Sequence, residues 1–140
     1  MIKYSDFEKI CNDLNLRICR NYIFTDEKYT HDISIGGILA NTDTECIGHI
    51  FSEKNRYKFQ FKNPSPNEIV WEFSYLEAFV PTEHMRPYHV YTKFTTKKIF
   101  FNVKDVRKCL EHSKKEIADL ATYSKRFKEK QALKEIEGDF

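Results

Sequence analysis

Two Cys-x-x-His pairs have residue types and a spacing that suit metal chemistry. They are Cys46-Ile47-Gly48-His49 and Cys109-Leu110-Glu111-His112. A Cys₂His₂ zinc site needs four ligands that converge at about 2.0–2.3 Å from the metal. Cys109 and His112 share a helix face, but Cys46 and His49 on a strand are an odd number of residues apart and point to opposite faces. We therefore expect no metal site and no cofactor.

Histidines gather most densely in His84–His89, together with Arg86 and Tyr88. Nucleophilic catalysis needs a Ser or Cys beside a histidine base that a third group orients. No Ser or Cys lies in a nucleophile-elbow motif, and Gly36-Gly37 lacks the Lys of a phosphate-binding loop. The sequence thus predicts no catalytic residue. A small enzyme with a site near His84–His89 remains an alternative interpretation.

Charge is distributed unevenly along the chain. Residues 1–85 carry 9 Lys/Arg and 13 Asp/Glu, and residues 86–130 carry 13 and 5. Basic side chains bind phosphates through charge, and aromatic rings stack on bases. A nucleic-acid-binding module using residues 86–130 is therefore one alternative, and a solvated helix face with inward rings is the other. The predicted basic-aromatic interaction surface consists of Arg86, Tyr88, Tyr91, Lys93, Lys97, Lys98, Lys104, Arg107, Lys108, Lys114 and Lys115.

The first half of the chain predicts a helix followed by a sheet. Ser5-Asp6-Phe7-Glu8 has the spacing of a capping box and precedes apolar residues at helical spacing, which predicts a helix from Asp6 to Leu14. Strands are expected next, the clearest having strict alternation of aromatic and polar residues. An antiparallel meander with one solvated face follows from this pattern. The expected strands cover residues 16–24, 32–40, 45–51 and 56–62.

The second half contains one ambiguous segment. The apolar residues in 66–80 fit both the spacing of a helix and the alternation of a strand. We favour a helix because Ser65, Pro66 and Glu68 form a helix-start signature. Residues 81–88 are expected to form a loop, and residues 89–94 and 98–102 a hairpin. A long helix is predicted from Val103, with a break near Ser113 because residues 113–116 match a capping box.

An apolar stripe at almost heptad spacing runs along this long helix. It consists of Val106, Leu110, Ile117, Leu120 and Phe127. The stripe suits two kinds of contact, with the sheet of its own chain or with the same helix of a second copy. Because two-fold dimers are the commonest oligomers, a homodimer is expected. The stripe thins after Phe127, so residues 128–140 are expected to project or fray.

Length and composition predict one α+β domain over residues 1–140. The four cysteines are scattered, and we expect them to be reduced and buried in a cytoplasmic protein without a signal peptide or a membrane span. Aromatic residues make up 15% of the chain, more than one small core needs. Some of these rings are therefore expected at an interface.

Together these observations favour a non-catalytic interaction protein. Aromatic surplus, polarised charge and a projecting helix are typical of small accessory factors encoded by phages and other mobile elements, which bind and inhibit or modulate a host protein. A protein partner is therefore expected first, and nucleic acid second. The enzyme interpretation comes third.

Overall fold

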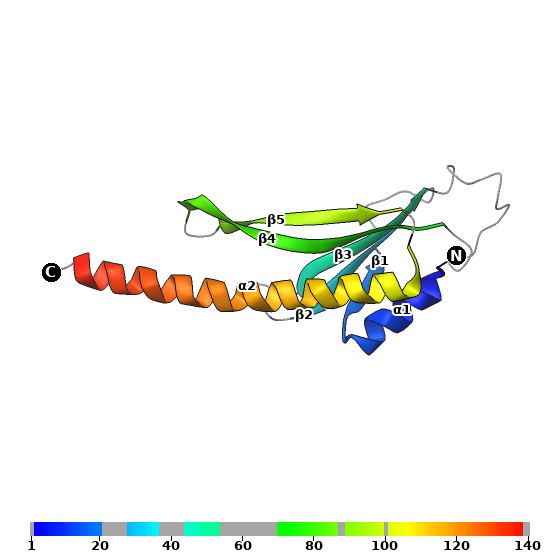
Figure 1. The fold of residues 1–140 in the computed structure, drawn as a ribbon, viewed down its shortest axis with the longest axis horizontal. Coiled ribbons are helices and arrows are strands. Elements are labelled where there is room, and N and C mark those ends of the chain that lie inside the picture. Colours follow the sequence, from blue (N-terminus) through cyan, green and yellow to red (C-terminus); the bar gives the residue numbers. More distant parts are fainter. Residues whose placement is uncertain are drawn as a thin grey trace.

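The computed structural model describes residues 2–20, 28–36, 44–53, 70–86, 89–99 and 101–138. Over these residues the chain forms an antiparallel five-stranded sheet with two helices on one side of it (Figure 1). We call the side that the helices cover the inner face and the opposite side the outer face. The elements are α1 (Tyr4–Asp13), β1 (Arg17–Arg20), β2 (Lys28–Gly36), β3 (Thr44–Glu53), β4 (Glu72–Arg86), β5 (His89–Lys98) and α2 (Val103–Gly138).

The sheet is a simple meander. Its strand order is β1-β2-β3-β4-β5, so each strand pairs with the next one along the chain. This confirms the predicted α+β class, with an N-terminal helix, a meander and a C-terminal helix on the sheet. The expected strand at residues 56–62 lies outside the described residues.

The preferred helix within residues 66–80 is wrong, because β4 begins at Glu72. Phe73 pairs with Ile50 on β3 and with Lys98 on β5, and its side chain is fully buried. A strand in this position satisfies its backbone groups on both sides, and its aromatic residues fit a pleated surface well. Pairing with two neighbours therefore outweighs the local helix-start signature.

The predicted loop at residues 81–88 and hairpin at residues 89–102 are also wrong. β4 continues to Arg86, and β5 runs unbroken to Lys98. Pro81 pairs with Tyr91, and Arg86 with His89. The two strands thus form one long hairpin, whose register shifts twice along its length. Aromatic and β-branched residues favour the extended backbone through the Thr95-Thr96 segment where we expected a turn.

Helix α1 starts two residues earlier than predicted. The Lys3 N–H donates to the Asp6 carboxylate over 2.9 Å, so Asp6 supplies the bond that we expected from Ser5 and Glu8. The helix buries Phe7, Ile10 and Cys11. It ends near Asn15, whose φ of 57° lies in the left-handed region that Asn tolerates better than most residues.

Helix α2 contains 36 residues and is about 54 Å long at 1.5 Å per residue. The Asn102 side chain caps it by accepting the Asp105 N–H over 2.8 Å. The predicted break at Ser113 does not occur. The Ser113 hydroxyl lies 3.0 Å from the Cys109 oxygen one turn back and 2.7 Å from the Leu76 oxygen on β4. It therefore bonds backward and across to the sheet instead of capping a new helix.

The core lies between the sheet's inner face and the two helices. Its fully buried side chains include Phe7 and Ile10 of α1, Ile33, Ile50 and Phe73 of the sheet, and Val106, Leu110 and Ile117 of α2. Of the four cysteines, Cys11 and Cys109 are buried, whereas Cys19 and Cys46 are exposed. The expectation that all four are buried is wrong, since the last two lie on outward positions of β1 and β3.

Candidate functional site

A row of polar residues crosses the outer face of the sheet. Asp32, His49, Ser74 and Lys97 are successive register partners on β2, β3, β4 and β5. Cys19 on β1 is the partner of Asp32 and extends the row to the edge. Directly paired residues lie on the same face of a sheet, about 5 Å apart. Five strands thus bring five chemically distinct side chains into one line.

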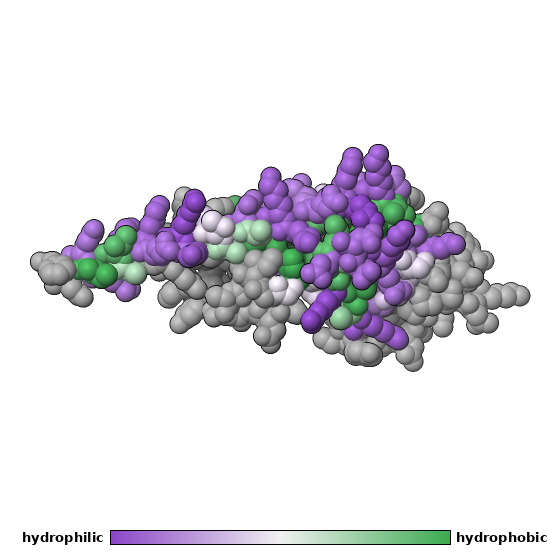
Figure 2. All heavy atoms as spheres, turned by 90° about the horizontal axis from the view of Figure 1, so that it is seen from below, coloured by the Kyte–Doolittle hydropathy of each residue, from purple (hydrophilic) through white to green (hydrophobic). Residues whose placement is uncertain are grey.

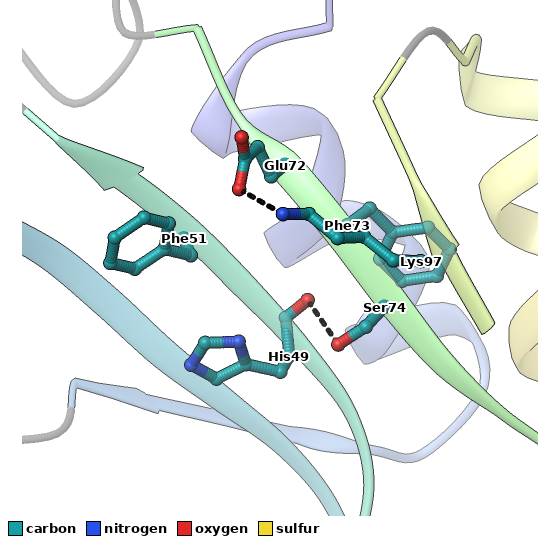
Figure 3. Close-up of a pocket in the computed structure, with 6 residues that line it drawn as sticks. All are labelled: His49, Phe51, Glu72, Phe73, Ser74 and Lys97. Carbon is teal, nitrogen blue, oxygen red and sulfur yellow. Dashed lines mark hydrogen bonds and ion pairs between the residues drawn. The ribbon is translucent and has the colours of Figure 1, made fainter. Parts of the chain in front are cut away.

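Beside this row lies a hollow of about 210 Å³. Its described lining residues are His49, Phe51, Glu72, Phe73, Ser74 and Lys97 (Figure 3). The His49 and Phe51 rings lie side by side on β3, with centroids 6.4 Å apart and planes inclined by 19°. Glu72 and Lys97 lie across from these rings, joined by an ion pair of 2.8 Å. The hollow therefore has a flat aromatic wall and a charged wall.

The electrostatics of the hollow are nearly balanced. The Glu72 side chain is only 5% exposed, and the Lys97 ammonium group compensates its charge. Burial lowers the pKa of His49, although Asp32, whose Oδ1 lies 3.9 Å from His49 Nε2, acts in the opposite direction. His49 is therefore neutral near pH 7, and the charges of the described lining residues, Glu72 and Lys97, cancel.

The order Ser–His–Asp along the row does not form a hydrolytic triad. The Ser74 hydroxyl donates to the main-chain oxygen of His49 over 3.5 Å, and not to the imidazole ring. The His49 ring points away from Ser74 (Figure 3). A nucleophile needs its base within hydrogen-bonding reach. What this arrangement offers is binding chemistry, with stacking on one side and paired hydrogen-bonding groups on the other.

Half of the described lysines and arginines of the predicted basic-aromatic surface pair with acidic side chains of the chain itself. Carboxylates pair with Lys93, Lys97, Lys98 and Arg107, through Glu45 at 3.6 Å, Glu72 at 2.8 Å, Asp105 at 3.1 Å and Asp13 at 2.8 Å respectively. Lys114 donates to the main-chain oxygen of Leu14 over 2.6 Å. These groups stabilise contacts between elements, so they offer little positive charge to a phosphate backbone.

Three lysines of that surface, Lys104, Lys108 and Lys115, are exposed on α2 and pair with no acid in the described ranges. They alternate there with acidic residues. The side chains of Arg86 and Tyr91, and the whole of Tyr88, lie outside the description. The basic-aromatic interaction surface therefore stays a prediction.

The apolar stripe of α2 faces the chain's own sheet. Val106, Leu110 and Ile117 are fully buried, and Leu120 is 5% exposed. The side chain of Phe127 lies outside the description. At four positions the stripe therefore packs against the sheet of its own chain, which is the first of the two predicted contacts. A homodimer stays a prediction and would need other residues for its interface.

The two Cys-x-x-His pairs lie apart. Cys46 and His49 are on β3, and Cys109 and His112 are on α2, where His112 Nε2 contacts the main-chain oxygen of Glu77 at 2.5 Å. Within the described ranges, no group of three or more His, Cys, Asp or Glu residues is placed to hold a metal ion. Of the residues of the enzyme alternative, His84 and Arg86 lie near the end of β4 and His89 at the start of β5; their side chains and the whole of Tyr88 are outside the description.

A second surface is formed by the part of α2 beyond Leu120. No described side chain after Leu120 is buried, and Tyr123, Leu133 and Ile136 are 41%, 59% and 57% exposed. Figure 1 shows the C-terminal end of the helix extending past the end of the β4–β5 hairpin. We call residues 121–138 the arm.

The polar row and the hollow were missed by the sequence analysis. Their residues come from all five strands, and only the register aligns them. The alternation in β3 and β4 was the available signal, but β4 had been assigned to a helix.

Among the described residues, neither helix combines the length and the apolar composition that crossing a bilayer requires. No family model matches this chain, and comparison with curated proteins and with solved structures found no match.

Proposed function

We propose that this chain is a non-catalytic interaction protein that binds another protein through the arm, residues 121–138. The observation that carries the proposal is the continuation of α2 for 18 residues beyond Leu120, the last buried side chain among those that the structure describes in this helix. Isolated helices of this length are marginal in water, so a helix without tertiary contacts is costly unless it has another use. Binding a partner is such a use.

The arm presents its apolar residues away from the sheet. A helix turns about 100° per residue, so Leu133 and Ile136 lie about 220° and 160° around the axis from Leu120. Both side chains therefore point away from the sheet, which the apolar stripe of α2 faces. Figure 2, which views the molecule from the helix side, shows apolar atoms near the C-terminal end of α2 among polar ones. The arm thus carries an outward apolar face that the chain itself leaves uncovered.

An amphipathic helix with a narrow apolar face binds proteins by lying in an apolar groove. Leu133 and Ile136 are one turn apart and would supply the anchors. Two such residues are too few for a stable helix-to-helix homodimer, which needs roughly 800 Å² per partner. A different protein with a preformed groove therefore fits the arm better than a second copy does.

The nucleic-acid alternative receives less support, because four lysines and arginines of the proposed surface already pair with carboxylates. The more specific proposal of a phage or mobile-element factor that inhibits or modulates a host protein in the cytoplasm rests on composition and charge.

The test compares capture of partners from an extract of source cells by three tagged proteins. They are the unaltered chain, the double variant Leu133→Ser/Ile136→Ser, and the control Lys125→Ser/Lys130→Ser, whose side chains are also exposed on the arm. Exposed substitutions of this kind change stability by only about 0.5 kcal/mol. We expect one protein to be retained in stoichiometric amount after nuclease and moderate salt by the first and third proteins, and lost by the second.

Two results would contradict the proposal. One is retention by the Leu133→Ser/Ile136→Ser variant at the level of the unaltered chain. The other is capture that disappears with nuclease, which would shift the assignment to nucleic acid.

A further inference from the structure

The hollow on the outer face has the features of a binding site, and it lies away from the arm. Its aromatic wall consists of the neighbouring His49 and Phe51 rings, and its charged wall of the Glu72–Lys97 pair. Pockets for drug-sized ligands are about 300–1,000 Å³. A hollow of about 210 Å³ therefore suits a ligand of one or two fused rings.

We propose that this hollow binds a planar, uncharged heterocycle of the nucleobase type, stacked on Phe51 and His49. Nucleobases stack on aromatic side chains, and this contact is worth about 1–3 kcal/mol per base. The planes of the two rings are inclined by only 19° and their centroids lie 6.4 Å apart, so a flat ligand meets two nearly parallel aromatic faces.

The opposite wall fits the edge of such a ring. The Glu72 carboxylate accepts hydrogen bonds, and the Lys97 ammonium group, which remains 58% exposed, donates them. Cytosine and guanine carry a donor and an acceptor side by side, so one edge of either base is complementary to an adjacent acceptor and donor. Ser74, in the same lining, adds a hydroxyl group.

The charge of the lining selects against strongly ionic ligands. Glu72 and Lys97 cancel, and burial lowers the pKa of His49 and keeps it neutral near pH 7. Lys97 is the one cation among the described lining residues, and it is already paired. The base itself is therefore recognised, and an attached phosphate adds little.

The test is a titration of the isotopically labelled full-length chain, followed through the ring-proton resonances of His49 and Phe51. The ligands are cytidine, guanosine and purine riboside, which stacks but lacks the adjacent donor and acceptor. We expect saturable shifts with cytidine or guanosine in the millimolar range or tighter, and binding of purine riboside weaker by about tenfold.

Two variants make the assignment specific. Phe51→Leu keeps an apolar side chain but removes the stacking ring, and we expect it to lose at least about tenfold in affinity. Lys108→Met removes an exposed lysine on α2 and serves as the control with unchanged affinity. Thermal unfolding of each variant shows whether the fold is retained.

Further ligands distinguish the source of the base. Cytidine monophosphate should bind no better than cytidine if the ligand is a free base or nucleoside. A much tighter oligocytidine with the same ring-proton shifts would identify single-stranded nucleic acid as the source of that base. Equal affinity for purine riboside, shifts confined to other residues, or no shift at millimolar concentrations would overturn the proposal. None of these outcomes depends on the protein partner of the arm.

Discussion

Gly48 lies on β3 where this strand packs closely against α2. A β-carbon built there would lie 3.2 Å from Leu110 Cδ2 and 3.3 Å from the main-chain oxygen of Ser74. The first of these neighbours is the end of a flexible side chain, but the second belongs to the backbone of β4. Any side chain at position 48 therefore pushes against both the helix and the adjacent strand.

We predict that Gly48→Ala lowers the free energy of unfolding by about 1–3 kcal/mol, the usual cost of overfilling a well-filled core. Chemical denaturation monitored by circular dichroism measures this change. Gly138→Ala is the matched control, because nothing lies within 4 Å of a β-carbon at that position. Equal stability of both variants would show that the sheet and α2 separate easily.

His31 is a buried titratable residue with consequences for pH dependence. It is 7% exposed, and its ring centroid lies 4.8 Å from that of Tyr4 and 5.6 Å from that of Trp71. Among the residues that the structure describes, its Nδ1 has no hydrogen-bond partner. Burial lowers its pKa, and the charges of Arg20 and His49 lower it further, whereas Asp32 acts to raise it. The folded protein therefore holds this imidazole neutral.

We predict that acid destabilises the fold through His31. The unfolded chain binds a proton at His31 near pH 6.5, and the folded chain does so only at lower pH, so stability falls as pH decreases through and below about 6.5. Thermal unfolding between about pH 7.5 and 5.5 measures this slope. His31→Phe keeps the ring contacts and should reduce the slope, leaving the part due to His49, whose pKa is lowered in the same direction. An unchanged slope in His31→Phe would refute this assignment.

At the scale of elements, residue patterns predicted what depends on neighbours in the sequence. The helical spacing of the apolar residues in α2 was sufficient to predict a helix. The strand patterns in the first half of the chain were sufficient to predict a meander. The segment that forms β4 was misassigned because its apolar residues fit both a helix and a strand. The contacts that decide between the two come from β3 and β5. Ser113 was misread for a related reason, since its hydroxyl bonds to β4, 37 residues away.

The bond from Ser113 to Leu76 joins α2 to β4, the strand next to the edge strand β5. We predict that Ser113→Ala lowers the free energy of unfolding by about 1–3 kcal/mol, because the hydroxyl is fully buried and its loss removes a partner from a main-chain oxygen. Equilibrium denaturation in urea measures the change. Thr122→Val is the control, since the Thr122 hydroxyl bonds one turn back, to Ala118 over 3.3 Å, on an exposed face. A similar cost for both would mean that the link to β4 contributes nothing.

At the scale of the whole molecule, the structure separates a folded body from the arm. Every buried side chain that the structure describes lies at or before Leu120, in the sheet, the two helices or the residues next to them. The sequence indicated a projecting C-terminal segment, because its apolar stripe thins after Phe127. The polar row on the outer face was beyond sequence analysis, since its alignment depends on the register of five strands and on a bulge between Ile33 and Ser34.

We predict that a chain ending at Lys128 folds with nearly the same stability as the full chain. The described side chains beyond Lys128 are exposed, so their removal should change the unfolding midpoint by no more than about 3 °C. Differential scanning calorimetry measures the midpoint. The shortened chain should also lose the partner captured by the arm. A large drop in the midpoint would instead mean that the segment helps to hold the fold together.

The length of α2 also means that one helix contains two kinds of amide. Amides near Val106 and Leu110 are held by the core and exchange with solvent hydrogen only when the whole domain opens. Amides in the arm are held by helical hydrogen bonds alone and exchange through fraying from the C-terminal end. Exchange rates should therefore rise along this single element after Leu120. A partner seated on the arm would slow exchange there first, and the body would act as an internal reference in the same spectrum.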